Sequence, residues 1–598
     1  MSPVYNEDGG YNDTTNSSWY ANDGNPYGKM MTTSNNENDA QRLTADVYAE
    51  LEPLENLKFK TIFGINYYAS EYRSLSPLYS FSAVDYNNDH TTTTQSMSKG
   101  HTLTWTNTAG YDFKVADDHS FNALIGMEAI RYQGTTMSAS NWNLLSQFND
   151  FSHAYLDNTI GQAHLDSDGN IVETRTVSGK PEYIYRRASY FGRIGYNYLE
   201  KYMFNATLRI DGSSKFARGH RWGGYFPSFS AGWVITNEDF MKNITDSRVL
   251  DFLKIRLSWG GQVGNQDIGD QQFVSPINTS NSYSADEPAA YYNFGTGKVN
   301  VPGAYSTRLA NTEVKWETSE QFNVGFDAYF LKNRLGVNAD FYTKTSKDWL
   351  VQIPILATVG TGAPPMLMEG DVKNTGVELA FTWRDNIGQF NYNVGVNGAY
   401  NKNKIGNIPT EGGIINGLSN MLYVNAGEFY RAQNGHAIGY FWGGYKTAGI
   451  FQNEQEIADW KAAGNGTLQT NPQPGDVKFL DLYHYDENGN IVPGADGKVD
   501  TADKVDLGNG TPDFTFGINI GFEYKGFDFS LNANGVMGNK IVQSYRDHNN
   551  PKANYTTAIL DRWTGEGTSN RIPRVTETNV NWEFSDLYLQ DGGFSPHK

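Results

Sequence analysis

The chain has 598 residues, a formal net charge of −19 and no cysteine. The absence of cysteine excludes disulfide frameworks, thiolate nucleophiles and cysteine-ligated metal sites. The acidic balance argues against nucleic acid as a partner, because neutralising phosphates needs a basic surface. No apolar run reaches the roughly 18 residues that a transmembrane helix needs, and an aromatic content of 14% argues against a disordered chain.

The first residues, from Met1 to Asp8, contain neither a basic region nor an apolar region, so they are not a secretory signal. Taken literally, this start is typical of a cytoplasmic protein. The patterns that follow predict instead that the true beginning of the protein is missing.

The dominant pattern is strict alternation of apolar and polar residues, which places alternate side chains on opposite faces of a β-strand. In the segment 390–400, apolar residues on one face oppose polar or small residues on the other: Phe390, Tyr392, Val394, Val396 and Tyr400 against Asn391, Asn393, Gly395 and Asn397. Similar patterns predict an all-β fold of about fourteen strands. Their positions are 43–51, 57–67, 102–113, 120–131, 186–198, 202–210, 226–235, 251–259, 315–330, 334–344, 374–384, 390–400, 513–524 and 527–537.

The connections between these strands alternate in length. Short ones at 200–201, 331–334, 385–389 and 525–526 alternate with long ones at about 133–185, 260–314, 345–373 and 401–512. A bacterial outer-membrane barrel has short periplasmic turns, long extracellular loops and an apolar face toward lipid. A charge on that face would cost roughly 2–4 kcal/mol near mid-membrane, which explains why the apolar rows carry none.

A soluble sandwich or barrel is the alternative, because alternation there separates the core from water. Strands near ten residues favour the membrane barrel, since soluble strands usually have about five or six. Aromatic residues near strand ends would then form the interfacial girdles. These are Tyr67, Tyr68, Trp105, Tyr198, Trp233, Trp259, Trp316, Trp383, Tyr400 and Tyr524.

Six motifs together resemble one protein family over nearly the whole chain. They are SYFGRIGYNY (189–198), RIDGSSKF (209–216), FPSFSAGW (226–233), LKIRLSWG (253–260), NTGVEL (374–379) and GNGTP (508–512). They are similar to the SusC/RagA family of TonB-dependent outer-membrane transporters, which import glycans or peptides in Bacteroidota. The resemblance implies a transmembrane antiparallel β-barrel in the outer membrane and a transporter rather than an enzyme.

The family barrel has about 22 strands and a plugged lumen, after a signal peptide, a small carboxypeptidase-regulatory-like domain and a TonB box. None of these preceding segments matches here, so we expect residues 1–598 to be an internal barrel fragment with about fourteen of those strands. Residues 585–594 resemble the approach to the family's last strands. Residues 595–598 depart from it, which predicts that the C-terminal strands are missing as well.

The resemblance also implies partners. In the family, a SusD-like surface lipoprotein covers the extracellular loops and captures substrate, and the TonB complex powers import by pulling on the plug. The long loops would then contact the lipoprotein or an oligosaccharide or peptide substrate. Loop aromatics that could stack on sugar rings, or merely pack the loops, are Tyr283, Tyr291, Tyr292, Phe294, Tyr430, Tyr440, Phe441 and Trp442.

Three other functions stay open. A TonB-dependent siderophore or vitamin receptor shares the architecture but takes a small chelate and needs no lipoprotein. A soluble secreted adhesin or carbohydrate-binding protein would be extracted without detergent. A passive porin is disfavoured by the family motifs.

One acidic segment resembles the second half of a calcium loop. Asp496, Asp500 and Asp503 surround a glycine that permits a sharp turn, and Asp481 could supply a first ligand. The intervening residues 482–495 interrupt the usual spacing, so a solvated acidic turn is the alternative to a bound divalent cation.

Enzymatic motifs are absent from the sequence. The ten histidines show no HExxH spacing, and no GxSxG or Walker pattern occurs. Asp327 and Asp340 could be read as a glycosidase pair, but their phase in the alternation predicts that they face a wet lumen. We therefore expect no catalytic residues and no resident cofactor apart from the calcium prediction.

Overall fold

The computed structural model describes residues 3–17, 24–148, 150–161, 164–165, 171–172, 175–263, 272–278, 291–294, 299–302, 304–352, 355–359, 361, 363–417, 429–543, 546, 555–576 and 580–593. The chain divides into two compact units, Met1–Tyr111 with Leu124–Gly192 and Ile210–Lys215, and Asp112–Ala123 with Arg193–Arg209 and Phe216–Lys598. The sites described below lie in the second unit.

Long strands dominate the described residues. They are β1 (Asn36–Leu54), β2 (Leu57–Ser76), β5 (Thr92–Val115), β6 (His119–Trp142), β10 (Tyr185–Tyr198), β11 (Tyr202–Ser213), β12 (Gly224–Val234), β13 (Leu250–Val263), β18 (Thr318–Phe330), β19 (Leu335–Lys347), β22 (Asp371–Ile387), β23 (Phe390–Gly406), β31 (Phe514–Tyr524) and β32 (Phe527–Met537). The α-helices are α1 (Pro26–Thr33), α2 (Lys242–Asp246) and α3 (Glu454–Ala462).

Shorter strands lie in the connections. They are β3 (Tyr79–Ser80), β4 (Tyr86–Asn87), β7 (His164–Leu165), β8 (Ile171–Val172), β9 (Thr176–Pro181), β14 (Ile277–Asn278), β15 (Tyr291–Phe294), β16 (Val299–Pro302), β17 (Tyr305–Ser306), β20 (Leu350–Gln352), β21 (Met366–Met368), β24 (Ile414–Asn416), β25 (Tyr430–Gln433), β26 (Tyr440–Phe441), β27 (Thr447–Ile450), β28 (Val477–Phe479), β29 (Tyr483–Tyr485), β30 (Ile491–Pro493), β33 (Lys540–Val542) and β34 (Leu589–Asp591).

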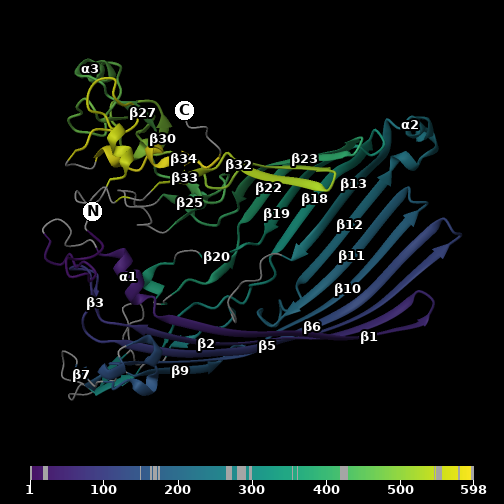
Figure 1. Cartoon of the computed structure of the whole chain (residues 1–598), viewed down its shortest axis with the longest axis horizontal. Helices are drawn as coiled ribbons and strands as arrows, with labels where there is room; N and C mark the ends of the chain where they lie inside the picture. The colour runs from purple at the N-terminus through teal and green to yellow at the C-terminus, as the bar shows by residue number, and fades with distance from the viewer. Residues whose placement is uncertain are drawn as a thin grey trace. The chain divides into compact units, whose positions relative to one another are not determined.

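The long strands form one sheet in chain order, β1-β2-β5-β6-β10-β11-β12-β13-β18-β19-β22-β23-β31-β32, with β9 beside β6. Figure 1 shows β12, β13, β18, β19, β22 and β23 side by side, and their registers are antiparallel. Each of the fourteen predicted segments overlaps one of these strands, so the all-β prediction is confirmed.

One face of the sheet is apolar and exposed. Val377 on β22 lies between Phe341 on β19 and Tyr400 on β23, and these three side chains remain 41%, 42% and 46% exposed. The apolar row continues on β31 and β32, where Phe522 faces Phe529 and their rings stack at 4.9 Å. So wide an apolar surface exceeds the scattered apolar residues of a soluble monomer and fits the predicted lipid contact.

Several of the predicted girdle residues lie on this apolar face, but two do not. Trp105, Trp233, Trp259, Tyr400 and Tyr524 are exposed there, whereas Trp316 is buried against Phe216 and Phe226 in a connection. Tyr68 points to the opposite face, where its hydroxyl lies 2.9 Å from that of Tyr132. Sequence position near a strand end did not distinguish these environments.

Tight turns join the strands at one end. Lys525 and Gly526, between β31 and β32, both have positive φ (49° and 85°), the geometry that matches the twist of a two-residue hairpin. Gly526 adopts it without steric cost because it lacks Cβ. One longer connection, 348–370, joins β19 to β22, and another, 407–513, joins β23 to β31.

The strands run past the predicted ends. β6 continues to Trp142 and β23 to Gly406, so these connections begin later than 133 and 401. Ladder hydrogen bonds continue there, as in the pairing of Lys404 with Lys373. Where water reaches both faces, polar residues occupy both, and the alternation that marks a strand disappears.

The longest connection folds into a unit that we call the loop module, made of the described residues of 429–512, 540–543 and 555–593. Phe429, Phe441, Leu507, Phe584 and Tyr588 form one of its cores. A second core contains Tyr445, Val477, Phe479 and Val499. The last described segment therefore packs back on the loop between β23 and β31, and α3, β27, β30, β33 and β34 are labelled in this part of Figure 1.

Among the described residues, no helix has the length and apolar character needed to cross a membrane.

Candidate functional site

The polar face of β23, β31 and β32 is an asparagine–glycine wall. Asn393 faces Gly521, Asn519 faces Gly395, and Asn397 faces Gly517. A Cβ at Gly521 would lie only 2.6 Å from Oδ1 of Asn393. The amide side chains therefore lie flat over glycine backbone, and the wall is lined by neutral hydrogen-bond donors and acceptors.

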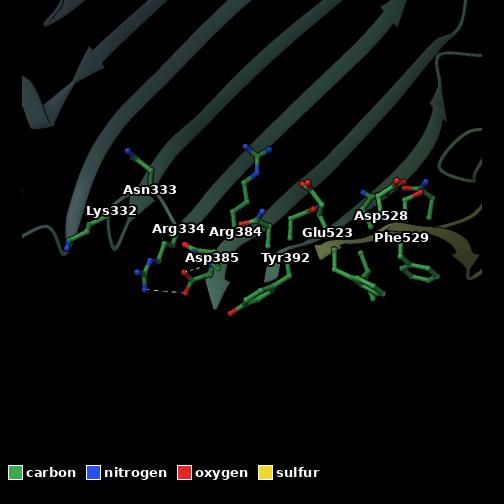
Figure 2. Close-up of a pocket in the computed structure, with 18 residues that line it drawn as sticks. Lys332, Asn333, Arg334, Arg384, Asp385, Tyr392, Glu523, Asp528 and Phe529 are labelled. Carbon is green, nitrogen blue, oxygen red and sulfur yellow. Dashed lines mark hydrogen bonds and ion pairs between the residues drawn. The ribbon is translucent and has the colours of Figure 1, made fainter. Parts of the chain in front are cut away.

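A recess of about 810 Å³ lies at the turn end of this wall. Asn391, Asn393, Asn519 and Asn532 line it together with the charged residues Arg384, Glu523 and Asp528. Figure 2 shows Arg384 and Glu523 projecting to one side of the sheet and Tyr392 and Phe529 to the other. The recess thus combines uncharged amides with charges of both signs.

The turn between β18 and β19 borders the recess. Leu331, Lys332 and Asn333 all have positive φ (57°, 64° and 59°), so a bend with left-handed backbone carries Arg334 toward β22. Arg334 Nη1 lies 3.2 Å from Asp385 Oδ2 (Figure 2). This ion pair joins the turn between β18 and β19 to the end of β22 at the edge of the recess.

A charged cluster lies further along the same face. Arg256 pairs with Asp327 at 2.8 Å and with Asp340 at 2.9 Å. Gly325 stands between them in the register, and a side chain there would collide with the Asp340 carboxylate. Asp327 and Asp340 lie on the polar face, as their phase in the alternation predicts, and both pair with Arg256. That this face lines a wet lumen stays a prediction.

The predicted loop aromatics have different roles. Tyr440 and Phe441 are 1% and 3% exposed, so they pack the loop module and cannot stack on a substrate. Trp442 receives the guanidinium of Arg431 at 3.9 Å from its ring centroid. Tyr283 lies outside the described residues, and the structure describes only the strand path of Tyr291, Tyr292 and Phe294.

Burial also changes the acidity of a module side chain. Tyr445 packs against Phe479 in the second core, and burial raises its pKa to about 12. On the β29–β30 hairpin, hydrogen bonds from the Asn490 side chain and backbone lower the pKa of Asp486.

The four predicted calcium ligands lie in segments of the loop module that hydrogen bonds join to one another. Asp481 accepts three backbone N–H groups at 2.8–3.1 Å, and Asp503 accepts three at 2.6–3.0 Å. Asp496 and Asp500 each accept one more, from the residue two positions later. Within the described parts of the chain, no group of three or more acidic, histidine or cysteine side chains is placed to hold a metal ion. Calcium binding stays a prediction.

A buried network that the sequence did not indicate ties the module together. Asp476 is 2% exposed and accepts from Nε and Nη2 of Arg574 at 2.7 and 3.3 Å. Asn581 donates to Asp476 at 2.8 Å, and its Oδ1 accepts from the amide of Val477 at 3.0 Å. Because these residues lie about a hundred positions apart, no local motif marks them.

Known proteins resemble this chain in both sequence and fold. The sequence profile of the family described as "TonB dependent receptor-like, beta-barrel" matches residues 2–488. "TonB-dependent receptor P3" of Formosa agariphila is 28% identical over 606 residues, covering 99% of this chain and 53% of that protein. "TonB-dependent receptor SusC" of Bacteroides thetaiotaomicron is 29% identical over 417 residues, covering 68% of this chain and 36% of that protein.

The fold is similar to a solved structure, "Structure of the RagAB peptide transporter". The TM-score is 0.71 at 20% identity, with 95% of this chain and 55% of that chain covered. The chain spans about half the length of the curated relatives it matches first.

Proposed function

Because this chain belongs to the TonB dependent receptor-like beta-barrel family, we propose that it forms barrel wall in a receptor that actively imports oligosaccharides or peptides. Like its relatives, it is an outer-membrane β-barrel protein and not an enzyme. The alternative of a soluble secreted adhesin is wrong, since the family is a membrane family and the sheet exposes a broad apolar face.

The similarity to SusC over 68% of this chain carries the proposal. It favours a large polar substrate over the small chelate of a siderophore or vitamin receptor. The asparagine–glycine wall supports the same substrate class. Amides can both donate to and accept from sugar hydroxyls or peptide groups without charge.

The proposed partners are a SusD-like surface lipoprotein and the TonB complex. The lipoprotein would sit on the side of the long connections, where the loop module offers a folded surface with two cores. The name RagAB belongs to a peptide transporter of similar fold, which supports a peptide as the alternative to a glycan.

Uptake in the native cell tests this proposal. Outer-membrane import of fluorescent oligosaccharide and peptide mixtures would be compared between wild-type cells, cells lacking this gene and cells lacking TonB. We expect one substrate class to lose uptake in both mutants. Uptake that is unchanged without TonB would contradict active transport, and loss of ferric chelate uptake alone would favour the siderophore receptor.

A further inference from the structure

The apolar face of β22 and β23 ends in lysines on the side of the long connections. Along β23, the alternate residues that follow Tyr400 on this face are Lys402 and Lys404. Lys373 of β22 faces Lys404 in the strand register. All three lysines are exposed, whereas Ile405, which has the opposite phase, is 3% exposed. The lysines therefore continue the outward row of the sheet beyond its apolar part.

The distance of these lysines from the apolar row matches the level of lipid headgroups. The row from Phe390 to Tyr400 has the length of a strand that crosses a bilayer, about 9–11 residues with a tilt of about 45°. At about 3.4 Å per residue, Lys402 and Lys404 would lie about 5 and 10 Å beyond Tyr400 along the membrane normal. Tyrosine is typical of the boundary between hydrocarbon and headgroups. Lysines just outside that boundary can reach headgroups while their methylene stems stay along apolar surface.

Two of the three lysines have no acid to neutralise them. Lys402 pairs with Asp513, and its Nζ lies 5.8 Å from the centroid of the Tyr400 ring. Among the residues that the structure describes, neither Lys373 nor Lys404 forms an ion pair. Residues that face each other in this way have Cβ atoms about 4.5–5.5 Å apart, and like charges there destabilise a sheet. An external anion between the two ammonium groups would remove this repulsion.

The other polar groups nearby leave these two charges uncompensated. Thr345 of β19 faces Lys373 from the side opposite β23 and places a hydroxyl group on the same face. Asp371 lies two residues before Lys373 on that face, but its carboxylate accepts from an asparagine side chain of the following turn. Glu320 is paired with Lys347 at 2.7 Å. The acids on this part of the face are therefore engaged, and the local balance is positive in a chain whose net charge is −19.

We propose that Lys373 and Lys404 bind the phosphate of an anionic lipid headgroup on the side of the long connections, with Thr345 and Lys402 beside it. Phosphate oxygens accept from ammonium and hydroxyl groups, and such charge-assisted hydrogen bonds are strong. A lipid is favoured over a free phosphate ion because the adjoining exposed apolar row, which includes Val377, can hold the acyl chains. This inference depends on the membrane family of the chain and not on the imported substrate.

Native mass spectrometry of the protein purified from outer membranes in detergent tests the inference. The probes are dioleoyl phosphatidic acid and dioleoyl phosphatidylcholine, which have the same chains but differ in headgroup charge. A cation near a membrane surface strengthens binding of anionic lipid about fivefold. Two unpaired lysines should therefore give phosphatidic acid a preference of about 25-fold for the first lipid bound. Lys373→Gln combined with Lys404→Gln should remove most of this preference.

A matched control changes two exposed lysines near the short turns, Lys58→Gln and Lys114→Gln, and should leave the preference intact. Equal binding of the two lipids, or the same preference after loss of Lys373 and Lys404, would overturn the inference. Displacement of phosphatidic acid by millimolar inorganic phosphate would also overturn it, because the site would then belong to a soluble anion.

Stability without lipid gives a second measurement. Removal of a like-charge pair should not destabilise the sheet, so the Lys373→Gln and Lys404→Gln double variant should be at least as folded as wild type in lipid-free detergent. A lower folded fraction on unheated gels would contradict the unpaired arrangement. The uptake assay measures a different property, so either proposal can fail alone.

Discussion

Removal of the Arg574 side chain should open the loop module locally. In the native structure the Asp476 carboxylate is 3% exposed and receives two bonds from this arginine. Arg574→Ala leaves that carboxylate buried with Asn581 and the Gln473 amide as its remaining donors. A buried charge without its countercharge is strongly destabilising.

The cost can be bounded from the geometry. Breaking a buried ion pair costs roughly 3–5 kcal/mol. Since the Arg574 side chain is 35% exposed, water can partly replace it, and the low end, about 3 kcal/mol, is expected. This corresponds to a change of about 100-fold in the local opening equilibrium. As a control, Lys242→Ala removes an exposed ion pair with Asp239 and should cost less than about 1 kcal/mol.

Hydrogen exchange measured by mass spectrometry is the appropriate assay. The amide of Val477 donates to Asn581 in this network, so peptides covering 475–479 should exchange about 100-fold faster in Arg574→Ala. Strands β22 and β23 should be unaffected. A change below about threefold in 475–479 would refute the reasoning, because the network would then not hold the module closed.

Three further outcomes follow from other parts of the molecule. Leu379→Arg places a charge on the lipid face and should destabilise the protein folded in the membrane by about 2–4 kcal/mol. The folded fraction on unheated gels measures this loss, and Ala380→Arg on the polar face should cause a far smaller one. The added methyl group of Gly535→Ala should clash with the Phe516 ring that lies over this glycine and destabilise the fold by about 1–3 kcal/mol. In a double-mutant cycle, Phe516→Leu should relieve the clash. Additive stability effects of the two substitutions would contradict the contact. Burial raises the pKa of Tyr445 to about 12, so its neutral phenol stabilises the module below pH 10, and this contribution is lost as pH rises toward 12. Proteolysis of the module should therefore accelerate between pH 10 and pH 12. Tyr445→Phe should remove this pH dependence of proteolysis.

The strands were predictable because lipid and lumen impose opposite polarities on alternate residues. Val394 and Val396 on one face of β23, against Asn393 and Asn397 on the other, specify both the strand and its register. The extensions of β6 and β23 were missed because the apolar–polar alternation stops there, as in the polar run 401–404. Ladder hydrogen bonds continue through that run, and Ile405 beside it is buried with Val372 and Ile408 in a local cluster that no period in the sequence marks.

The loop module was not predictable for a different reason. Its cores join residues such as Phe441 and Phe584 that are far apart in the chain, and no period connects them. Asp476 and Asn581 likewise meet only through the tertiary structure. The glycines of the asparagine–glycine wall were visible as small residues in the polar rows, but their pairing with asparagine depends on register between strands.

The asparagine–glycine wall has a consequence for movement along it. Across the paired strands β23 and β31, one amide stands at each step of the polar row from Asn393 to Asn397. Successive steps lie about 6.6–6.8 Å apart, and flat side chains leave no protruding step between them. A solute sliding along this face would exchange one set of weak hydrogen bonds for an equivalent set at each position. Repeated weak binding of this kind permits passage, because no single position holds the solute tightly enough to trap it.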